Sequence, residues 1–337
     1  MQALNLERFS LCHLLGHGAN YEVYDAIDRE SGRSVVLKRP WAQSLRGGQH
    51  RPVDEQSAQL IRVHHLLDGA TPHISRLVGY AERTRHDQFF GDSLPQEYYV
   101  LVEERASGVP LVADIKDKFR GVPIGLGQNL FALYPLVSGC LGLNESIFEW
   151  LLDVEEAFLR VNHLILDLRP QNVYFAPRRG KITVIDLGMC IDLQAGTSNR
   201  SLPDIHDSLG ELCKYYLAPQ QPPTQQQGYR ELFGSGPPLG FSKELERMIR
   251  DCSRLPTGPL QDIAVEILHR VKRRDYGAIA PFRQDLRTFF AAREARNQGL
   301  QDFPTMLQAW RAGMAMFHEK YWRKFLFNPE TDLVSYA

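Results

Sequence analysis

Hydrophobic and polar residues alternate along the first part of the chain, which is the pattern of half-buried β-strands. The alternation runs from about Phe9 to Asp28 on both sides of a turn at Gly16–Asn20, and it predicts a β-hairpin. The apolar run Val35-Val36-Leu37, followed by Lys38, predicts a third strand. In the same region we predict two more strands and one helix, at Ile74–Gly79, Tyr98–Val102 and about Asp54–Leu67. This part of the chain is therefore mostly sheet.

After Gly108-Val109-Pro110 the pattern changes to the spacing of amphipathic helices. A helix is predicted from about Glu145 to Val161, where apolar residues recur on one face at Ile147, Leu151, Val154, Phe158 and Val161. Two short apolar segments, Val173–Phe175 and Ile182–Ile185, flank a turn and predict a second hairpin. Further helices are predicted at Ile205–Leu217, Lys243–Cys252, Leu260–Arg273, Phe282–Arg296 and Pro304–Phe325.

These elements predict an α+β fold with a small β-sheet lobe at residues 1–107 and a larger α-helical lobe at residues 108–275. Residues 276–337 are predicted to form a helical extension packed on the larger lobe. Aromatic and sulfur-containing side chains recur there at helical spacing, at Trp310, Met314, Phe317, Tyr321, Trp322 and Phe325. Packing against the larger lobe is the simpler interpretation of this stripe, and a partner-binding helix is the alternative.

Composition narrows the class of protein. Of the 337 residues, 43% are hydrophobic and 23% charged, which is typical of a globular protein. The net charge is −1, so the protein has no overall electrostatic field that would attract nucleic acid or anionic membranes. The five cysteines are dispersed and follow no metal-binding spacing. No signal peptide pattern and no run of eighteen apolar residues is present. We therefore expect a cytoplasmic protein that binds neither nucleic acid nor membranes.

The Gly-rich turn and Lys38 form the first candidate site. Gly16-His17-Gly18 lies between two predicted strands, and glycines in such a turn let backbone N–H groups approach phosphate oxygens. A strand, rather than a helix, follows the glycines, which argues against a dinucleotide-binding unit. Lys38 can reach beneath the hairpin and neutralise phosphates. Alternatively, the turn is purely structural and the lysine faces solvent.

The second candidate site is the stretch Leu166-Asp167-Leu168-Arg169-Pro170-Gln171-Asn172, followed by Val184-Ile185-Asp186-Leu187-Gly188. Phosphoryl transfer needs a carboxylate that accepts or orients the hydroxyl proton, and oxygen ligands for magnesium. Asp167 can serve as the carboxylate, and Asn172 and Asp186 can serve as the magnesium ligands. Each residue alone could simply cap a loop. The joint arrangement is what favours chemistry.

Together these motifs resemble a eukaryotic-type Ser/Thr protein kinase domain, from about residue 9 to residue 273. The resemblance implies a bilobal fold that binds ATP and Mg²⁺, with Asp167, Lys38 and Arg169 as catalytic residues and Asn172 and Asp186 as metal ligands. It also implies a hinge at Glu103–Ala106. Besides Gly16, Gly18 and Lys38, the nucleotide-binding residues would be Leu15, Val23, Val36, Glu55, Glu104 and Tyr174.

The chain departs from this family in two ways that concern activation. In the family a helix glutamate pairs with the strand lysine. Here Glu55 is the candidate, although the apolar spacing of the helix puts Gln59 at the expected place. The arginine that usually precedes the catalytic aspartate is replaced in Ile165-Leu166-Asp167. Activation through a phosphorylated loop is therefore not expected.

The activation segment can be aligned in two ways. Ala218-Pro219-Gln220 could end it, but too few residues would then remain for the helices that follow. We prefer to begin the central buried helix at Asp204–Gly210, which leaves a short segment from Asp186 to Pro203. Leu255–Pro259 offers no arginine to pair with a segment-closing glutamate. In the family this segment is the platform for a peptide substrate.

Three functions follow from these observations. The first is a protein kinase acting on Ser/Thr hydroxyls of a protein substrate. The second is a pseudokinase that binds nucleotide and serves as a scaffold or regulator for a partner protein. The third is a small-molecule kinase, with a pocket shaped by residues 118–143.

Overall fold

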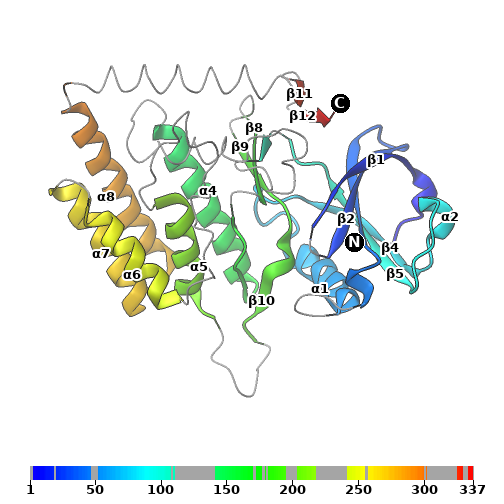
Figure 1. The fold of residues 1–337 in the computed structure, drawn as a ribbon, viewed down its shortest axis with the longest axis horizontal. Coiled ribbons are helices and arrows are strands. Elements are labelled where there is room, and N and C mark those ends of the chain that lie inside the picture. Colours follow the sequence, from blue (N-terminus) through cyan, green and yellow to red (C-terminus); the bar gives the residue numbers. More distant parts are fainter. Residues whose placement is uncertain are drawn as a thin grey trace. The chain divides into compact units, whose positions relative to one another are not determined.

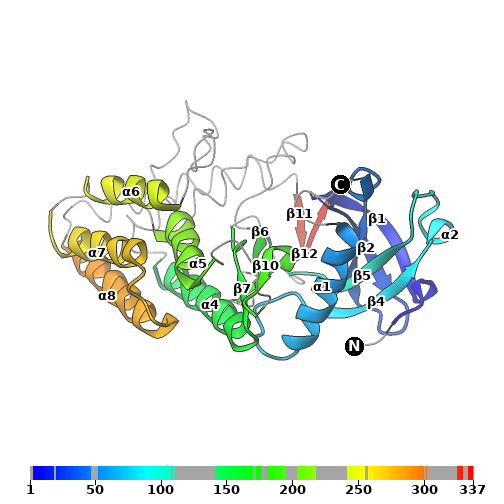
Figure 2. The same ribbon diagram turned by 90° about the horizontal axis from the view of Figure 1, so that it is seen from below.

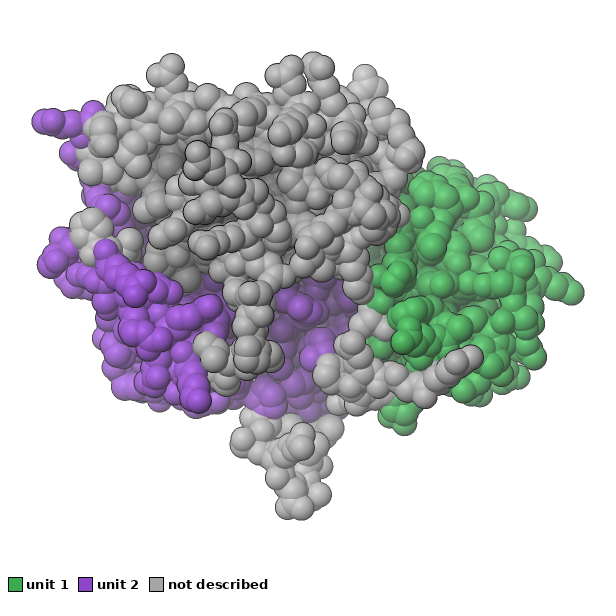
Figure 3. All heavy atoms as spheres, in the orientation of Figure 1, with its two compact units in different colours: residues 1–106 green, residues 107–337 purple. Residues whose placement is uncertain are grey.

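The computed structural model has a mixed α+β fold made of two compact units, residues 1–106 and 107–337, which Figure 3 shows in two colours. Each unit is described by itself below. The structure describes residues 3–18, 20–46, 52–107, 109–110, 141–169, 172–176, 179, 181–194, 203–217, 241–254, 257–299, 301, 325–328 and 333–336.

The first unit is built on a five-stranded antiparallel sheet. The strand order is β1-β2-β3-β5-β4, so that β3 lies at the centre. The strands are β1 (Phe9–His17), β2 (Tyr21–Asp28), β3 (Ser34–Pro40), β4 (Leu77–Thr84) and β5 (Tyr98–Glu104). The predicted hairpin, the third strand and the strand at Tyr98–Val102 are confirmed.

The fourth strand lies further along the chain than we predicted. It runs over Leu77–Thr84 rather than Ile74–Gly79. Its buried side chains include only Leu77 and Ala81, with Gly79 between them, and this combination carries little hydrophobic signal.

Helix α1 (Val53–Leu66) packs on the sheet through contacts with β5 and β4, as Figure 2 illustrates. Leu60 and Val63 are fully buried, which confirms the predicted helix and its inner face. A single-turn helix, α2 (Asp87–Phe90), precedes β5 and ends at Gly91, whose positive φ of 74° is accessible to glycine without strain.

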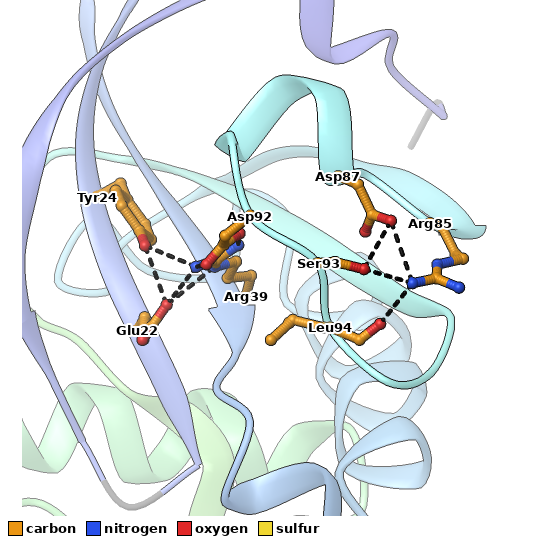
Figure 4. Close-up of polar contacts among 8 residues, drawn as sticks. All are labelled: Glu22, Tyr24, Arg39, Arg85, Asp87, Asp92, Ser93 and Leu94. Carbon is orange, nitrogen blue, oxygen red and sulfur yellow. Dashed lines mark hydrogen bonds and ion pairs between the residues drawn. The ribbon is translucent and has the colours of Figure 1, made fainter.

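Arg39 holds the α2 loop against the sheet. Its guanidinium donates to Glu22 Oε2 at 2.9 Å, to Asp92 Oδ2 at 2.7 Å and to the Tyr24 hydroxyl at 2.9 Å (Figure 4). It also lies over the ring of Phe90, 4.4 Å from the centroid. Because Arg39 is only 2% exposed, these contacts replace almost all of its hydration.

The second unit is mainly helical. Its long helices are α4 (Leu141–Arg160), α5 (Ile205–Leu212), α6 (Phe241–Cys252), α7 (Pro259–Arg273) and α8 (Ile279–Gln298). Helix α7 packs against α6 and α8, and α8 packs against α4 (Figure 1). These five predicted helices are confirmed, with ends shifted by a few residues, and α5 continues into a π-helical turn at Cys213–Leu217.

Gly210 explains how closely α5 approaches α6. A Cβ atom at this position would lie 2.6 Å from the ring of Phe241. The absence of a side chain therefore lets the two helices pack.

Two small sheets carry the loops of the second unit. Strands β8 (Val173–Ala176) and β9 (Lys181–Val184) form the predicted hairpin, and β6 (Val109–Pro110) joins β8. The pairing of β7 (His163–Ile165) with β10 (Cys190–Asp192) was not predicted. Strands of three residues leave no readable alternation, and their pairing is set by the rest of the fold.

The C-terminal end differs from the predicted helical extension. Of the predicted helix Pro304–Phe325, only Phe325 is described, and it begins β11 (Phe325–Asn328), which pairs with β12 (Leu333–Tyr336). Three segments named above lie outside the described residues: the rest of that helix, positions 118–140 of the stretch predicted to shape a pocket, and Ala218–Gln220. Within the described part of the chain, no helix has the length and apolar content needed to cross a membrane.

Candidate functional site

The Gly-rich turn and Lys38 lie in one row across three strands. Gly16 pairs with Val23 in the β1–β2 ladder, and Val23 pairs with Lys38 in the β2–β3 ladder. Residues directly opposite each other in antiparallel strands share a face of the sheet. The register therefore places three of the predicted nucleotide-binding residues side by side.

The glycines of this turn have no conformational reason to be glycine. Neither Gly16 nor Gly18 has a positive φ, and a Cβ atom at Gly16 would meet nothing within 4 Å. At Gly18 a Cβ would only touch the carbonyl oxygen of Tyr21 at 4.0 Å. The missing side chains therefore leave open space above the turn, as a phosphate-binding backbone requires.

The turn is held in place by helix α1. Gly18 N–H donates to the Tyr21 carbonyl at 2.8 Å, which closes the turn. Asn20 Nδ2 donates to Gln56 Oε1 at 2.7 Å, and the hydroxyls of Tyr21 and Ser57 lie 2.9 Å apart. These bonds fix the turn relative to the helix.

Lys38 forms a buried ion pair with Glu103 of β5. Lys38 Nζ lies 2.8 Å from Glu103 Oε1, and the two side chains are 9% and 2% exposed. The ladder explains the contact, because Glu103 pairs with Val36, which lies on the same face of β3 as Lys38. His64 of α1 reaches the same carboxylate, with Nε2 3.9 Å from Oε1.

The charges of this cluster follow from its surroundings. Burial opposes ionisation of Glu103, but Lys38, His64 and hydrogen bonds from Lys38 and Ser75 together hold the pKa of Glu103 below its usual value. Burial lowers the pKa of His64, an effect that Glu103 opposes and Lys38 reinforces. At neutral pH Glu103 is therefore a carboxylate that pairs with Lys38, and His64 is a neutral imidazole.

Glu103 replaces the partner that the sequence suggested for Lys38. Glu55 lies exposed in the first turn of α1, and Gln59 is buried on the inner face of that helix. The pairing with Glu103 depends on the register of β3 and β5, which the local sequence does not encode. Glu103 directly follows the predicted strand Tyr98–Val102 and falls in the predicted hinge, whereas β5 continues to Glu104. The available signal was this acid next to an apolar strand.

Two of the remaining nucleotide-binding candidates of the first unit lie on or beside this face, whereas Glu104 pairs with Val35 and lies on the opposite face. Val36 is buried beside Glu103, and Leu15 occupies the irregular step of β1 next to Gly16. Glu104 forms an ion pair with Arg76 at 2.9 Å, and its backbone N–H donates to the Arg76 carbonyl at 2.8 Å.

In the second unit, Asp167 is the centre of a compact hydrogen-bonded loop. Asn172 Nδ2 donates to Asp167 Oδ2 at 3.0 Å and to its backbone carbonyl at 3.1 Å. Arg169 Nε contacts the other carboxylate oxygen of Asp167. Asp167 is 7% exposed, whereas the Arg169 side chain is 47% exposed. Both oxygens of Asp167 are thus oriented, and each keeps a further lone pair for a proton.

Asp186 is brought next to this loop by the hairpin that follows. Ile185 N–H donates to the Asn172 carbonyl at 2.8 Å, which joins the end of β9 to the Asp167 loop. Asp186 itself has a left-handed backbone, with φ 58°, and its exposed side chain accepts from Gly188 N–H at 3.4 Å. Asp is among the few residues that adopt this conformation readily.

Asn172 and Asp186 could hold a magnesium ion. Since Nδ2 of Asn172 donates to Asp167, its side-chain oxygen is the atom left to bind a metal. Mg²⁺ prefers such oxygen ligands and takes the rest of its shell from phosphate and water. In the described ranges, no three His, Cys, Asp or Glu side chains form a metal-binding group of their own, so the protein would supply only part of the shell.

Two further sequence predictions concern elements next to this loop. Tyr174 lies on β8, two residues after Asn172, and is half-buried. The preferred start of the central helix is confirmed, because Asp204 caps α5 and Asp207 completes a capping box. Residues 195–202 of the short segment before it lie outside the described residues.

Comparison with known proteins assigns no family to the chain. No protein-family model matches the sequence, and no curated protein is significantly similar to it. The function is therefore argued from the two residue sets described above.

Proposed function

We propose that the protein is an ATP- and Mg²⁺-dependent phosphotransferase with a bilobal, protein-kinase-like fold, which transfers the γ-phosphate to Ser/Thr hydroxyls of a protein. In this proposal both residue sets act on one Mg-ATP. The observation that carries it is the hydrogen-bonded loop that unites Asp167, Arg169, Asn172 and, through Ile185, Asp186. A carboxylate, a cation and two oxygen ligands for magnesium are the groups that this reaction needs.

The first unit supports the nucleotide side of the proposal. The open Gly16–Gly18 turn offers backbone N–H groups to phosphate, and Lys38 in the same row offers an ammonium group. Glu103 orients the lysine through the buried ion pair. The antiparallel sheet with one packed helix, together with a helical second unit, is compatible with a small and a large kinase lobe.

The proposed step moves one phosphoryl group and one proton. The substrate hydroxyl oxygen forms a bond to the γ-phosphorus, the bond from that phosphorus to the β,γ-bridging oxygen breaks, and ADP leaves. Asp167 accepts the hydroxyl proton and later releases it to water. Lys38 and Arg169 offset negative charge on the phosphates. When bound, Mg²⁺ neutralises charge on the phosphate oxygens.

A second candidate function is a nucleotide-binding pseudokinase. It is favoured by the contact of Arg169 with Asp167 and by the burial of Lys38 against Glu103, because each ties a catalytic group to a neighbour. Such a protein would bind Mg-ATP without turning it over.

The test is phosphoryl transfer from radiolabelled ATP to generic Ser/Thr substrates by the purified full chain. We expect Mg²⁺-dependent transfer that Asp167→Asn abolishes. Asp262→Asn, which removes an exposed acid in the first turn of α7, should leave transfer unchanged. If Mg-ATP raises the melting temperature but no transfer occurs, the pseudokinase function holds. If neither is observed, both functions are rejected.

A further inference from the structure

An acidic residue, Glu155, lies in the core of the second unit. It belongs to α4 and is 1% exposed, and the residues on either side along its face, Leu151 and Phe158, are fully buried. A carboxylate in such surroundings is costly unless it is neutral or well bonded. The residue thus needs a reason to be there.

Glu155 lies where α4 meets α5 and β7, the strand that leads into the Asp167 loop. Its Oε1 accepts a hydrogen bond from the hydroxyl of Ser208 on α5, which is itself 2% exposed. Both α4 and α5 pack against β7, whose last residue, Ile165, lies two residues before Asp167. The Ile165 backbone is the other group that lowers the pKa of the carboxyl group, through a hydrogen bond. Within the described part of the chain, Oε2 has no hydrogen-bond partner.

The protonation state of the carboxyl group agrees with this placement. Burial raises the pKa of Glu155 to about 8, against the opposing effect of the bonds from Ser208 and Ile165. No charged side chain is among the causes of this shift. On the adjacent elements, His163 of β7 is bonded to the Val161 carbonyl, and His206 of α5 is bonded to Asp204 and Tyr276. At neutral pH Glu155 is therefore mostly an uncharged acid.

We infer that Glu155 is a positioning residue, which fixes the backbone just before Asp167 by accepting hydrogen bonds from Ile165 and Ser208 in one buried site. Its effect on catalysis rests on the proposed phosphotransferase function. On the other side of this backbone, Leu166 N–H donates to the Met189 carbonyl at 3.1 Å. The strand leading to Asp167 is thus held from β10 and from α4.

Three variants test this inference. Glu155→Gln keeps the shape and an acceptor oxygen, whereas Glu155→Leu keeps similar volume but removes the acceptor. The control is Glu156→Gln, which changes the neighbouring acid, 38% exposed and 3.1 Å from Arg283. For each variant, hydrogen exchange at the Ile165 amide is measured together with kcat and the KM for ATP.

Glu155→Leu should speed exchange at Ile165 by about tenfold or more, as expected for one lost hydrogen bond in a buried strand. It should also lower kcat by about tenfold or more with KM for ATP unchanged, because Asp167 is no longer held in place. Glu155→Gln should retain both properties, and Glu156→Gln should resemble the wild type.

Normal exchange at Ile165 in Glu155→Leu would overturn the inference, as would a Glu155→Gln variant as impaired as Glu155→Leu. If the wild type shows no turnover, the proposed function fails, and exchange at Ile165 still decides the role of Glu155.

Discussion

Lys38 and Arg39 are adjacent cations on β3 with opposite surroundings. Their side chains point to opposite faces of the sheet because successive strand residues alternate. Lys38 shares its face with the open Gly-rich turn and contacts Glu103, beside His64. On the other face Arg39 contacts Glu22, Asp92 and Tyr24 (Figure 4). It also lies over the ring of Phe90.

The comparison shows that burial and ion pairing do not by themselves indicate function. Both cations are buried and paired, and the bonds of both join parts of the first unit to one another. The space beside them is what differs. Lys38 lies in a row whose glycines leave open space. Arg39 is therefore a structural clamp, and Lys38 is the cation that the proposal assigns to a ligand.

The largest expected difference between the two cations concerns turnover. Lys38→Met should lower kcat/KM for ATP by about 100-fold or more, the cost of losing one preorganised charge at the phosphates. Arg39→Met should leave kcat/KM unchanged when it is expressed per folded molecule. Equal losses in both variants would remove the distinction between the two faces.

Arg39 should matter for the stability of the fold rather than for turnover. Arg39→Met should lower the free energy of unfolding by about 3 kcal/mol, because the packing on Phe90 and Tyr24 is lost and Glu22 and Asp92 lose their counter-charge. Urea denaturation followed by fluorescence measures this change. A loss below about 1 kcal/mol would mean that the clamp contributes little.

A double variant separates charge pairing from catalysis on the Lys38 face. Lys38→Met alone leaves Glu103 buried without its cation, and should cost about 3 kcal/mol of stability. Adding Glu103→Leu should bring the free energy of unfolding to within about 1 kcal/mol of the wild type, since an apolar pair can replace a buried ion pair. Turnover should stay lost in the double variant. Recovery of turnover would show that Lys38 is not the phosphate ligand.

The smallest effect concerns pH and again lies on the Lys38 face. The pKa of His64 is lowered in the folded state, so the unfolded chain binds more protons as the pH falls below about 6.5. Stability should therefore fall by up to about 1.4 kcal/mol per pH unit below that value, and His64→Gln should flatten this dependence.

Glu103 adds a similar loss of stability only below about pH 4.5, because its pKa is also lowered. On the Arg39 face, Asp92 has a lowered pKa and Tyr24 a raised one of about 12, so neither group titrates between pH 5 and 6.5.

The sequence predicts the elements that local pattern determines. The Gly-rich hairpin, the strand with Lys38, the long helix α4 and the start of α5 at Asp204 are all recognisable from periodicity and capping residues. The position of β4 is not, because its buried face includes Gly79 and Ala81.

The contacts that define the site depend on distant parts of the chain. Glu103 is 65 positions after Lys38, and the pair exists because of strand register. Arg39 meets Asp92 through a loop whose conformation local sequence does not specify. Glu155 could have been noticed, since it follows Leu151 by one helical turn on the buried face of α4.

The most direct test of the account is a crystal structure of the full chain with Mg²⁺ and a non-hydrolysable ATP analogue. We expect Lys38 to contact the phosphates while it keeps its pairing with Glu103, and the metal to bind the side-chain oxygens of Asn172 and Asp186. A nucleotide bound without Lys38, or a metal bound away from Asn172 and Asp186, would contradict the claim that the two residue sets act on one Mg-ATP.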